Sequence, residues 1–109
     1  MSLRAPLRVP VELKRQRVDD RWFRLADAVS VEGLQLGQVV PDEVEGPLEV
    51  TFHLPGVVEP VRCHGEAIEE VVGEGDQERA ERRAVRFLDL DPEGAARIQA
   101  YVQERLGLI

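Results

Sequence analysis

Apolar and polar residues alternate along much of this 109-residue chain with the period of two that is typical of half-buried β-strands. The clearest example is 48–54, where Leu, Val, Phe and Leu alternate with Glu, Thr and His. Similar but less regular alternation predicts five more strands, at 9–13, 21–30, 34–40, 57–72 and 84–90. In 21–30 neither parity is cleanly apolar, so that pattern leaves the orientation of the strand open. Residues 73–83 are charged and contain glycine, which predicts an exposed loop.

The end of the chain changes from strand to helix periodicity. Asp91-Pro92-Glu93 predicts a helix start, because Asp caps free amides, Pro fits the first helical position and Glu suits the positive end of the dipole. Apolar residues at helical spacing follow, at Ile98, Tyr101, Val102 and Leu106, and Gly107 is a suitable terminator. The pattern as a whole predicts an all-β fold with a C-terminal helix, namely a six-stranded antiparallel barrel capped by one α-helix.

Length and composition place this fold in a single domain over residues 1–109. No apolar run approaches the ~18 residues that would cross a membrane, and the start of the chain is too short and basic for a signal peptide. The single Cys63 forms no internal disulfide and gives no sign of an oxidising compartment. We therefore expect a cytoplasmic protein without membrane insertion.

Charge is distributed unevenly along the chain, although the net charge is −7. Residues 1–24 contain seven basic and three acidic side chains, giving +4, whereas residues 25–109 contain seven basic and eighteen acidic ones, giving −11. A basic end on an acidic body suits a small anion bound at one place, while duplex nucleic acid would be repelled by the rest of the surface. A solubilising charge distribution without any ligand is the alternative.

Two arginines in the basic segment are the strongest candidates for ligand binding. Arg4 and Arg8 are four residues apart, and the prolines at positions 6 and 10 make a helix there unfavourable. The guanidinium group is a planar donor fork with a permanent charge, and it fits both phosphate oxygens and the O6/N7 edge of guanine. The pair could therefore converge on one ligand that carries phosphate and guanine.

This Arg-x-x-x-Arg pair, followed by Ala28-Val29-Ser30-Val31-Glu32-Gly33, resembles the signature of PilZ domains, in which (Asp/Asn)-x-Ser-x-x-Gly is the second motif. The resemblance extends over nearly the whole chain and implies a PilZ-like six-stranded barrel whose ligand is the bacterial messenger cyclic di-GMP. It assigns phosphate and guanine binding to Arg4 and Arg8. Ser30 would contact a guanine edge, and Gly33 would allow a tight turn or close approach of the ligand.

Position 28 departs from the family motif, because the methyl group of Ala28 offers no acceptor to a guanine N–H. An unpaired guanine edge would reduce binding by roughly 1–3 kcal/mol, or about tenfold to a hundredfold in affinity. Asp27 is the neighbouring carboxylate. Successive strand residues point to opposite faces, so Asp27 could replace the missing acceptor only if the strand contained a bulge.

Other candidate chemistry is weaker. Cys63 and His64 are adjacent, so on a strand they diverge, and one Cys with two His is a poor metal-ligand set. No phosphate-binding Gly-rich loop or nucleophile elbow is present, which argues against an enzyme and leaves no catalytic or metal residues to name. Of the neighbours Trp22 and Phe23, one is expected in the core and the other at the surface.

Two functional hypotheses follow. The first is a cyclic di-GMP receptor that switches an output protein, with motility, exopolysaccharide or surface attachment as the settings that the resemblance suggests. The second is a degenerate PilZ-like interaction module that binds no nucleotide, for which Ala28 is the main support. A barrel for single-stranded nucleic acid is disfavoured by the acidic body and the few aromatic residues.

Overall fold

The computed structural model describes residues 2–16 and 19–108. Within these ranges the chain forms seven strands, a short 3₁₀ helix and one α-helix. In chain order these are β1 (Ala5–Pro6), β2 (Pro10–Arg15), β3 (Arg21–Val29), β4 (Gly33–Leu36), β5 (Leu48–Phe52), β6 (Val61–Val72), η1 (Gly75–Gln77), β7 (Arg79–Phe87) and α1 (Pro92–Arg105). The loop expected between β2 and β3 includes residues 17 and 18, which lie outside the described ranges.

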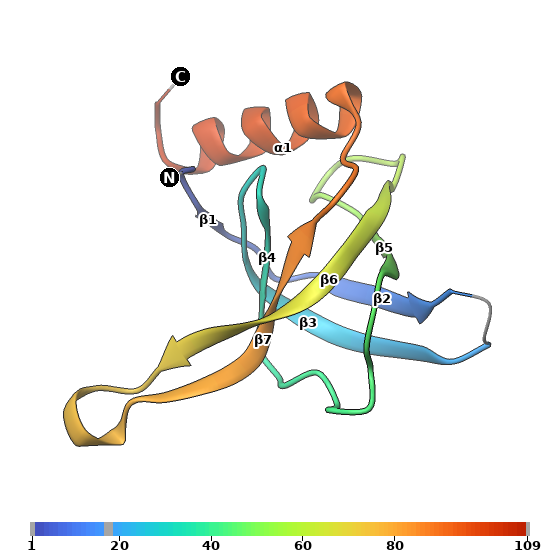
Figure 1. Cartoon of the computed structure of the whole chain (residues 1–109). Coiled ribbons are helices and arrows are strands. Elements are labelled where there is room, and N and C mark those ends of the chain that lie inside the picture. Colours follow the sequence, from blue (N-terminus) through green and yellow to red (C-terminus); the bar gives the residue numbers. More distant parts are fainter. Residues whose placement is uncertain (1, 17–18, 109) are drawn as a thin grey trace.

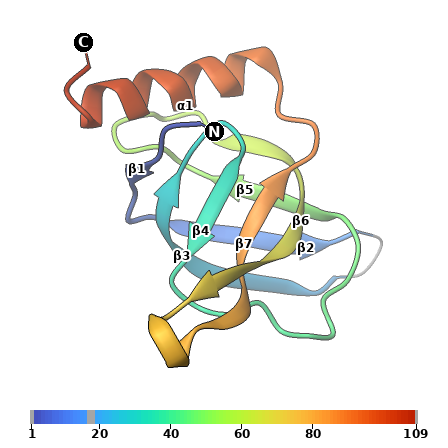
Figure 2. The same cartoon turned by 60° about the vertical axis from the view of Figure 1, so that its left-hand side comes forward.

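Six of these strands close into an antiparallel barrel (Figures 1 and 2). Their order around the barrel is β3-β2-β5-β6-β7-β4, and β4 pairs with β3 to complete the circle. The two-residue β1 pairs with the far end of β3, on the same side as β2. The fold class expected from the sequence, an all-β barrel of six antiparallel strands with one C-terminal helix, is confirmed.

The core lies inside the barrel and under α1. The strand with the cleanest alternation, β5, buries Leu48, Val50 and Phe52 almost completely. Phe52 stacks on Phe87 of β7, with ring centroids 6.1 Å apart and the ring planes 11° from parallel. This aromatic pair joins two strands that are separated by β6, so it adds a contact inside the barrel that the strand pairing does not make.

A β-bulge at Asp27 explains why the sequence of β3 showed no clean apolar face. Ala26 pairs with Leu36, whereas Ala28 pairs with Gln35, so Asp27 is an extra residue on β3. The inward parity is even before the bulge, ending at Ala26, and odd after it, as at the buried Val29. Of the two neighbouring aromatics, Trp22 packs against the core and Phe23 is exposed, in agreement with the sequence interpretation.

Several expected boundaries were wrong, including the start of β6, which is Val61 rather than residue 57, and the end of β7, which is Phe87 rather than residue 90. Residues 79–83, expected to lie in an exposed loop, form the first half of β7, and with β6 they make a hairpin that projects from the barrel (Figure 1). Side chains on both faces of this arm are exposed or half-buried, so neither face needs to be apolar. The sequence of the arm therefore lacks the alternation of apolar and polar residues that marks a half-buried strand. Strand β4 ends at Leu36 rather than Val40, and Val40 is nevertheless buried.

The segment that carries the two arginines is extended and packed along β3. Ala5 and Leu7 are buried, while Arg4, Pro6 and Arg8 are exposed. This alternation places the two arginines on the same outward face of the segment. The Leu7 amide donates a hydrogen bond to the Asp27 carbonyl at 3.0 Å, so pairing with β3 continues beyond β1.

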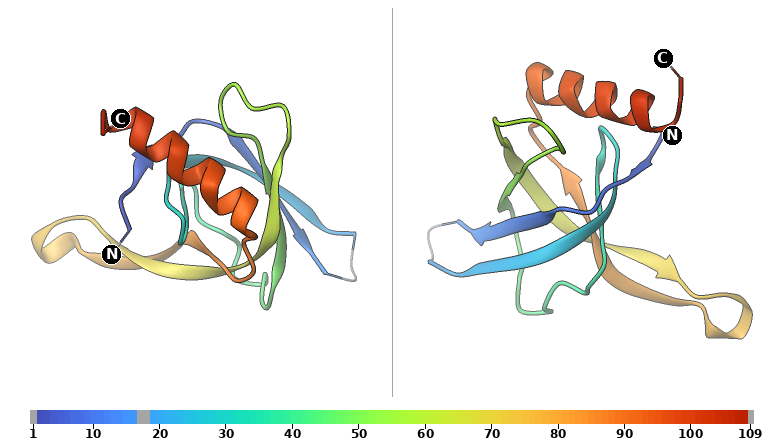
Figure 3. Two further views of the ribbon diagram at one scale, coloured as in Figure 1. Left: turned by 90° about the horizontal axis from the view of Figure 1, so that it is seen from above. Right: turned by 180° about the vertical axis from the view of Figure 1, so that it is seen from behind.

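Helix α1 begins and packs as its sequence predicts. The Asp91 carboxylate accepts a hydrogen bond from the Gly94 amide at 2.6 Å, which is an N-cap interaction. Ile98 and Val102 are buried, and Figure 3 shows the helix lying across one end of the barrel. Leu106 follows the helix and is 39% exposed, so it is only partly covered. No helix within the described ranges has the length and hydrophobicity needed to span a bilayer.

Candidate functional site

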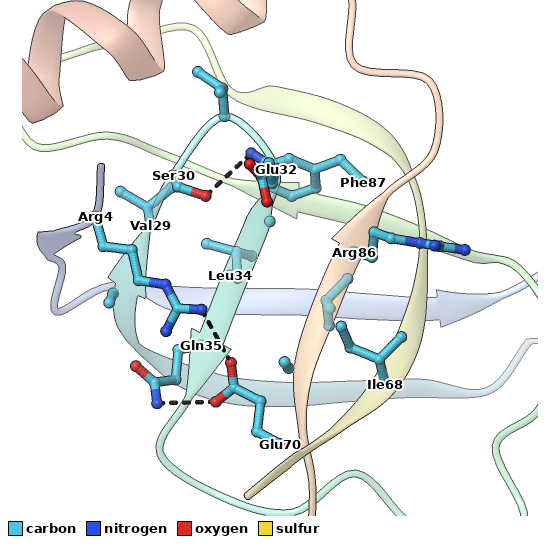
Figure 4. Close-up of a pocket in the computed structure, with 15 residues that line it drawn as sticks. Arg4, Val29, Ser30, Glu32, Leu34, Gln35, Ile68, Glu70, Arg86 and Phe87 are labelled. Carbon is cyan, nitrogen blue, oxygen red and sulfur yellow. Dashed lines mark hydrogen bonds and ion pairs between the residues drawn. The ribbon is translucent and has the colours of Figure 1, made fainter. Parts of the chain in front are cut away.

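A pocket of about 400 Å³ lies on the outer surface of the barrel, over β3, β4, β6 and β7 (Figure 4). Its floor is a row of residues that pair directly across neighbouring strands and therefore share a face. Along this row Pro6 pairs with Ala28, Ala28 with Gln35, Gln35 with Ala84, and Ala84 with Ile68. The methyl groups of Ala28 and Ala84 leave space above the sheet on either side of Gln35.

Arg4 and Glu70 face each other across this pocket (Figure 4). The Nη2 atom of Arg4 lies 3.5 Å from Oε1 of Glu70, and the Arg4 side chain is 56% exposed. Oε2 of Glu70 accepts a hydrogen bond of 2.9 Å from the Gln35 amide. At this distance and exposure the ion pair with Arg4 is weak, so the guanidinium remains available for an anion entering from solvent.

Ser30 and Glu32 form the other end of the pocket, in the turn between β3 and β4. Ser30 is buried, and its hydroxyl oxygen accepts a hydrogen bond of 3.1 Å from the Glu32 amide. The hydroxyl hydrogen is thus left to donate elsewhere. The Glu32 carboxylate accepts hydrogen bonds from the Ser2 hydroxyl at 2.8 Å and the Ser2 amide at 3.1 Å, and these bonds lower the pKa of Glu32.

Gly33 lines the pocket, and its lack of a side chain is required by the barrel itself. It pairs with Arg86 across β4 and β7, and a Cβ at this position would lie 2.0 Å from the carbonyl oxygen of Val85. The contact is with backbone, so it is relieved only by moving a strand. The close approach expected at Gly33 is therefore between two strands, in addition to any approach of a ligand.

Replacing Gly33 by alanine is expected to lower the free energy of unfolding by about 1–3 kcal/mol, the usual range for overpacking. Gly37→Ala is the matched control, because there the nearest atom to the added Cβ, at 3.2 Å, belongs to the exposed Asp27 side chain, which is free to move. Urea denaturation of both variants measures the difference. Equal stability of the two variants would contradict a structural requirement for glycine at position 33.

The two candidate residues that precede Ser30 take different positions. Ala28 is in the pocket floor, as its place in the motif requires. Asp27 occupies the bulge that its participation would need, but it is outside the residues that line the pocket, and its Oδ1 lies near Gly37 instead. The bulge thus directs Asp27 away from Arg4 and Ser30.

Arg8 lies on the same outward face as Arg4, but it is not part of the pocket lining. Four residues of extended chain separate their Cα atoms by about 13 Å. No hydrogen bond or ion pair joins the Arg8 side chain to another residue in the described part of the chain. The structure therefore brings Arg4, Ser30 and Gly33 together and leaves Arg8 exposed beside them.

Four further polar residues line the pocket that the sequence interpretation did not select, namely Glu32, Gln35, Glu70 and Arg86. Gln35 comes from β4, two residues after Gly33, whereas Glu70 comes from β6, which reaches the site only through the pairing of β6 with β7 and of β7 with β4. The Arg86 guanidinium is paired with Glu66 and extends away from Arg4 in Figure 4. The sequence alone does not single out these residues, because their meeting depends on the strand register, which a single sequence does not specify.

The adjacent Cys63 and His64 diverge as expected for strand neighbours. Cys63 is buried in the core, and burial raises the pKa of its thiol to about 12. His64 lies outside, where its Nδ1 is 2.6 Å from Oδ2 of Asp89. That hydrogen bond and a second one from the His64 amide lower the pKa of Asp89. A protonated, inward-facing thiol is not a nucleophile, so the pair has a structural role.

Comparison with known proteins identifies the fold. No protein-family model matches this sequence, and no curated protein matches it either. Solved structures superpose on it over nearly its whole length, and one of them is a PilZ domain, so the chain has a PilZ-like fold, and the resemblance inferred from the motifs is confirmed at that level.

One similar structure is the PilZ domain of Escherichia coli YcgR with cyclic di-GMP, at a TM-score of 0.64 and 14% identity, covering 98% of this chain and 91% of that one. Another is the Bacillus subtilis inhibitor of motility MotI/DgrA, at 0.67 and 12%, covering 98% and 51%. The third is MrkH, described as a cyclic di-GMP-dependent transcription regulatory factor, at 0.65 and 13%, covering 98% and 50%. The chain thus spans about half the length of MotI/DgrA and of MrkH.

Proposed function

We propose that residues 1–109 form a single PilZ-like domain that binds cyclic di-GMP and acts as a cytoplasmic receptor or adaptor rather than an enzyme. The observation that carries this proposal is the meeting of Arg4, Ser30 and Gly33 in one pocket on a PilZ-like fold. Arg4 is 26 residues before Ser30 in the sequence, and all three residues match the family motifs independently of the fold comparison. The YcgR structure, which contains cyclic di-GMP, supports the choice of ligand.

In this proposal Arg4 binds a phosphate of the ligand and the Ser30 hydroxyl donates to a guanine. Arg8 approaches from the edge of the pocket. Its guanidinium forms no ion pair with a carboxylate in the part of the chain that the structure describes. Ligand binding draws Arg4 away from Glu70 and changes the surface formed by the N-terminal segment. An output protein recognises that surface, and motility, exopolysaccharide production and attachment are the proposed settings. The inhibitor of motility among the similar structures supports the first of these.

The second candidate remains an interaction module that binds no nucleotide. Ala28 favours it because the acceptor that the family motif has at this position is missing. The carboxylates of Glu32 and Glu70 also favour it, because they line the pocket beside one loosely paired guanidinium, that of Arg4. A dianionic ligand would meet repulsion from both carboxylates. The two candidates differ in whether nucleotide binds at all.

Calorimetric titration of cyclic di-GMP into the purified protein at near-physiological salt tests the proposal. We expect saturable heat with a defined stoichiometry, and no saturable heat with GMP at the same concentration, because GMP does not present two linked phosphates and two guanines. Absence of saturable heat with cyclic di-GMP would contradict the receptor function. The interaction module would then be the better account, and a pull-down would search for the partner.

A further inference from the structure

Glu70 is a carboxylate that lines the pocket together with Ala28. It follows Ile68 by two residues on β6, so it shares the outward face that forms the pocket floor. Gln35 pairs directly with Ala28 across β3 and β4, and the side-chain amide of Gln35 donates a hydrogen bond to the Glu70 carboxylate. One side chain therefore separates Glu70 from the position where the PilZ motif has Asp or Asn.

We infer that Glu70 accepts the guanine edge of the ligand in place of the side chain that Ala28 lacks. This inference rests on the proposed binding of cyclic di-GMP and adds a specificity-determining residue that lies outside both sequence motifs. The Watson–Crick edge of guanine carries two adjacent N–H donors, at N1 and N2. A carboxylate has two oxygens at a matching separation and accepts both, whereas the methyl group of Ala28 accepts neither.

The orientation of Glu70 suits this role. Gln35 holds Oε2 at 2.9 Å through a neutral amide, which fixes the carboxylate without neutralising its charge. Oε1 is 3.5 Å from the Arg4 guanidinium, beyond normal hydrogen-bond length. A carboxylate offers about four acceptor positions, so at least two remain without a partner. Gln35 is thus a positioning residue for Glu70.

Because the ion pair between Arg4 and Glu70 is weak, Arg4 can bind a phosphate while Glu70 binds a guanine. When Arg4 turns to a phosphate, Glu70 loses its cation while its side chain is only 18% exposed. A partly buried carboxylate without a donor is unfavourable, and the two guanine N–H groups satisfy it. Arg4 and Glu70 then contact different parts of one ligand, the phosphate and the base.

Base selectivity distinguishes a contact between Glu70 and guanine from an indirect effect of Glu70 on the binding of phosphate by Arg4. Adenine presents an acceptor at N1 and has no amino group at C2, so it repels the carboxylate that guanine binds. Cyclic di-AMP has the same phosphate ring as cyclic di-GMP, and any effect on Arg4 changes both affinities equally. The ratio of the two affinities therefore reports on the contact to the base alone.

The test is calorimetric titration of both cyclic dinucleotides into wild-type protein, Glu70→Gln and Glu69→Gln. Glu69 is the exposed neighbour on β6 and is not in the pocket lining, so its variant has the same charge change without the contact. We expect the preference for cyclic di-GMP to fall about tenfold or more in Glu70→Gln and to stay unchanged in Glu69→Gln. An unchanged preference in Glu70→Gln would overturn the inference while leaving the receptor function intact. Absence of binding by wild-type protein would overturn both.

A rescue experiment uses the family residue. Ala28→Asn placed in the Glu70→Gln background restores an acceptor to the floor, and we expect it to recover most of the lost preference for cyclic di-GMP. In the wild-type background Ala28→Asn should change the preference by less than about threefold, because Glu70 already fills the role. A tenfold gain from Ala28→Asn alone would show that wild-type protein lacks a base acceptor, and this would overturn the inference.

Discussion

Replacing Arg4 by alanine is expected to weaken binding of cyclic di-GMP by about tenfold to a hundredfold, the largest effect of any pocket substitution. A hydrogen bond to a charged group contributes about 1.5–3 kcal/mol, and each 1.4 kcal/mol is a factor of about ten in affinity. Arg4 is the one cation among the described pocket residues that faces the pocket with only a loose ion pair. Calorimetric titration of the wild-type and variant proteins measures the difference.

Arg21→Ala is the matched control for this loss of charge. Arg21 is an exposed arginine on β3, outside the pocket, and its ion pairs with Glu12 and Asp19 are each 3.9 Å long. We expect the affinity of the Arg21→Ala variant for cyclic di-GMP to stay within about twofold of the wild-type affinity. Arg8→Ala should fall between the two, because Arg8 shares the face of Arg4 but lies outside the pocket lining. A larger loss for Arg8→Ala than for Arg4→Ala would reverse the roles proposed for them.

Much of the fold could be predicted from sequence because most strands have one face inside the barrel. The alternation in β5 and the capped start of α1 are local signals that need no tertiary information. Where the structure departs from that simple case, the signal fails. The bulge at Asp27 switches the parity of β3, and the projecting arm of β6 and β7 exposes both faces to solvent.

The candidate site was predictable only as far as its motifs extend. Arg4, Ser30 and Gly33 were selected from sequence and meet in the pocket. The pairing that sets Glu70 beside Gln35 depends on strands 35 residues apart in the chain, so no local pattern reveals it. The importance of Gly33 for the β4–β7 contact is equally invisible, because it depends on the Val85 carbonyl.

Replacing Phe52 by alanine is expected to lower the free energy of unfolding by about 3–5 kcal/mol, the largest effect on stability. Phe52 is 1% exposed and stacks on Phe87, so its removal leaves a cavity and also ends an aromatic contact. The loss is a large share of the roughly 5–15 kcal/mol that is typical of a domain. Urea denaturation measures it as a lower midpoint with an unchanged slope.

Phe23→Ala is the control, because it deletes the same side chain at a position on β3 that is 60% exposed. It leaves no cavity, so it measures only the part of the stability change that comes from the strand preference of phenylalanine. We expect its cost to stay below about 1 kcal/mol, the range of strand propensities. Because Phe87 also lines the pocket, Phe52→Ala should weaken cyclic di-GMP binding even where the variant is folded, whereas Phe23→Ala should not. Equal effects of the two substitutions on stability would contradict a core centred on the Phe52–Phe87 pair.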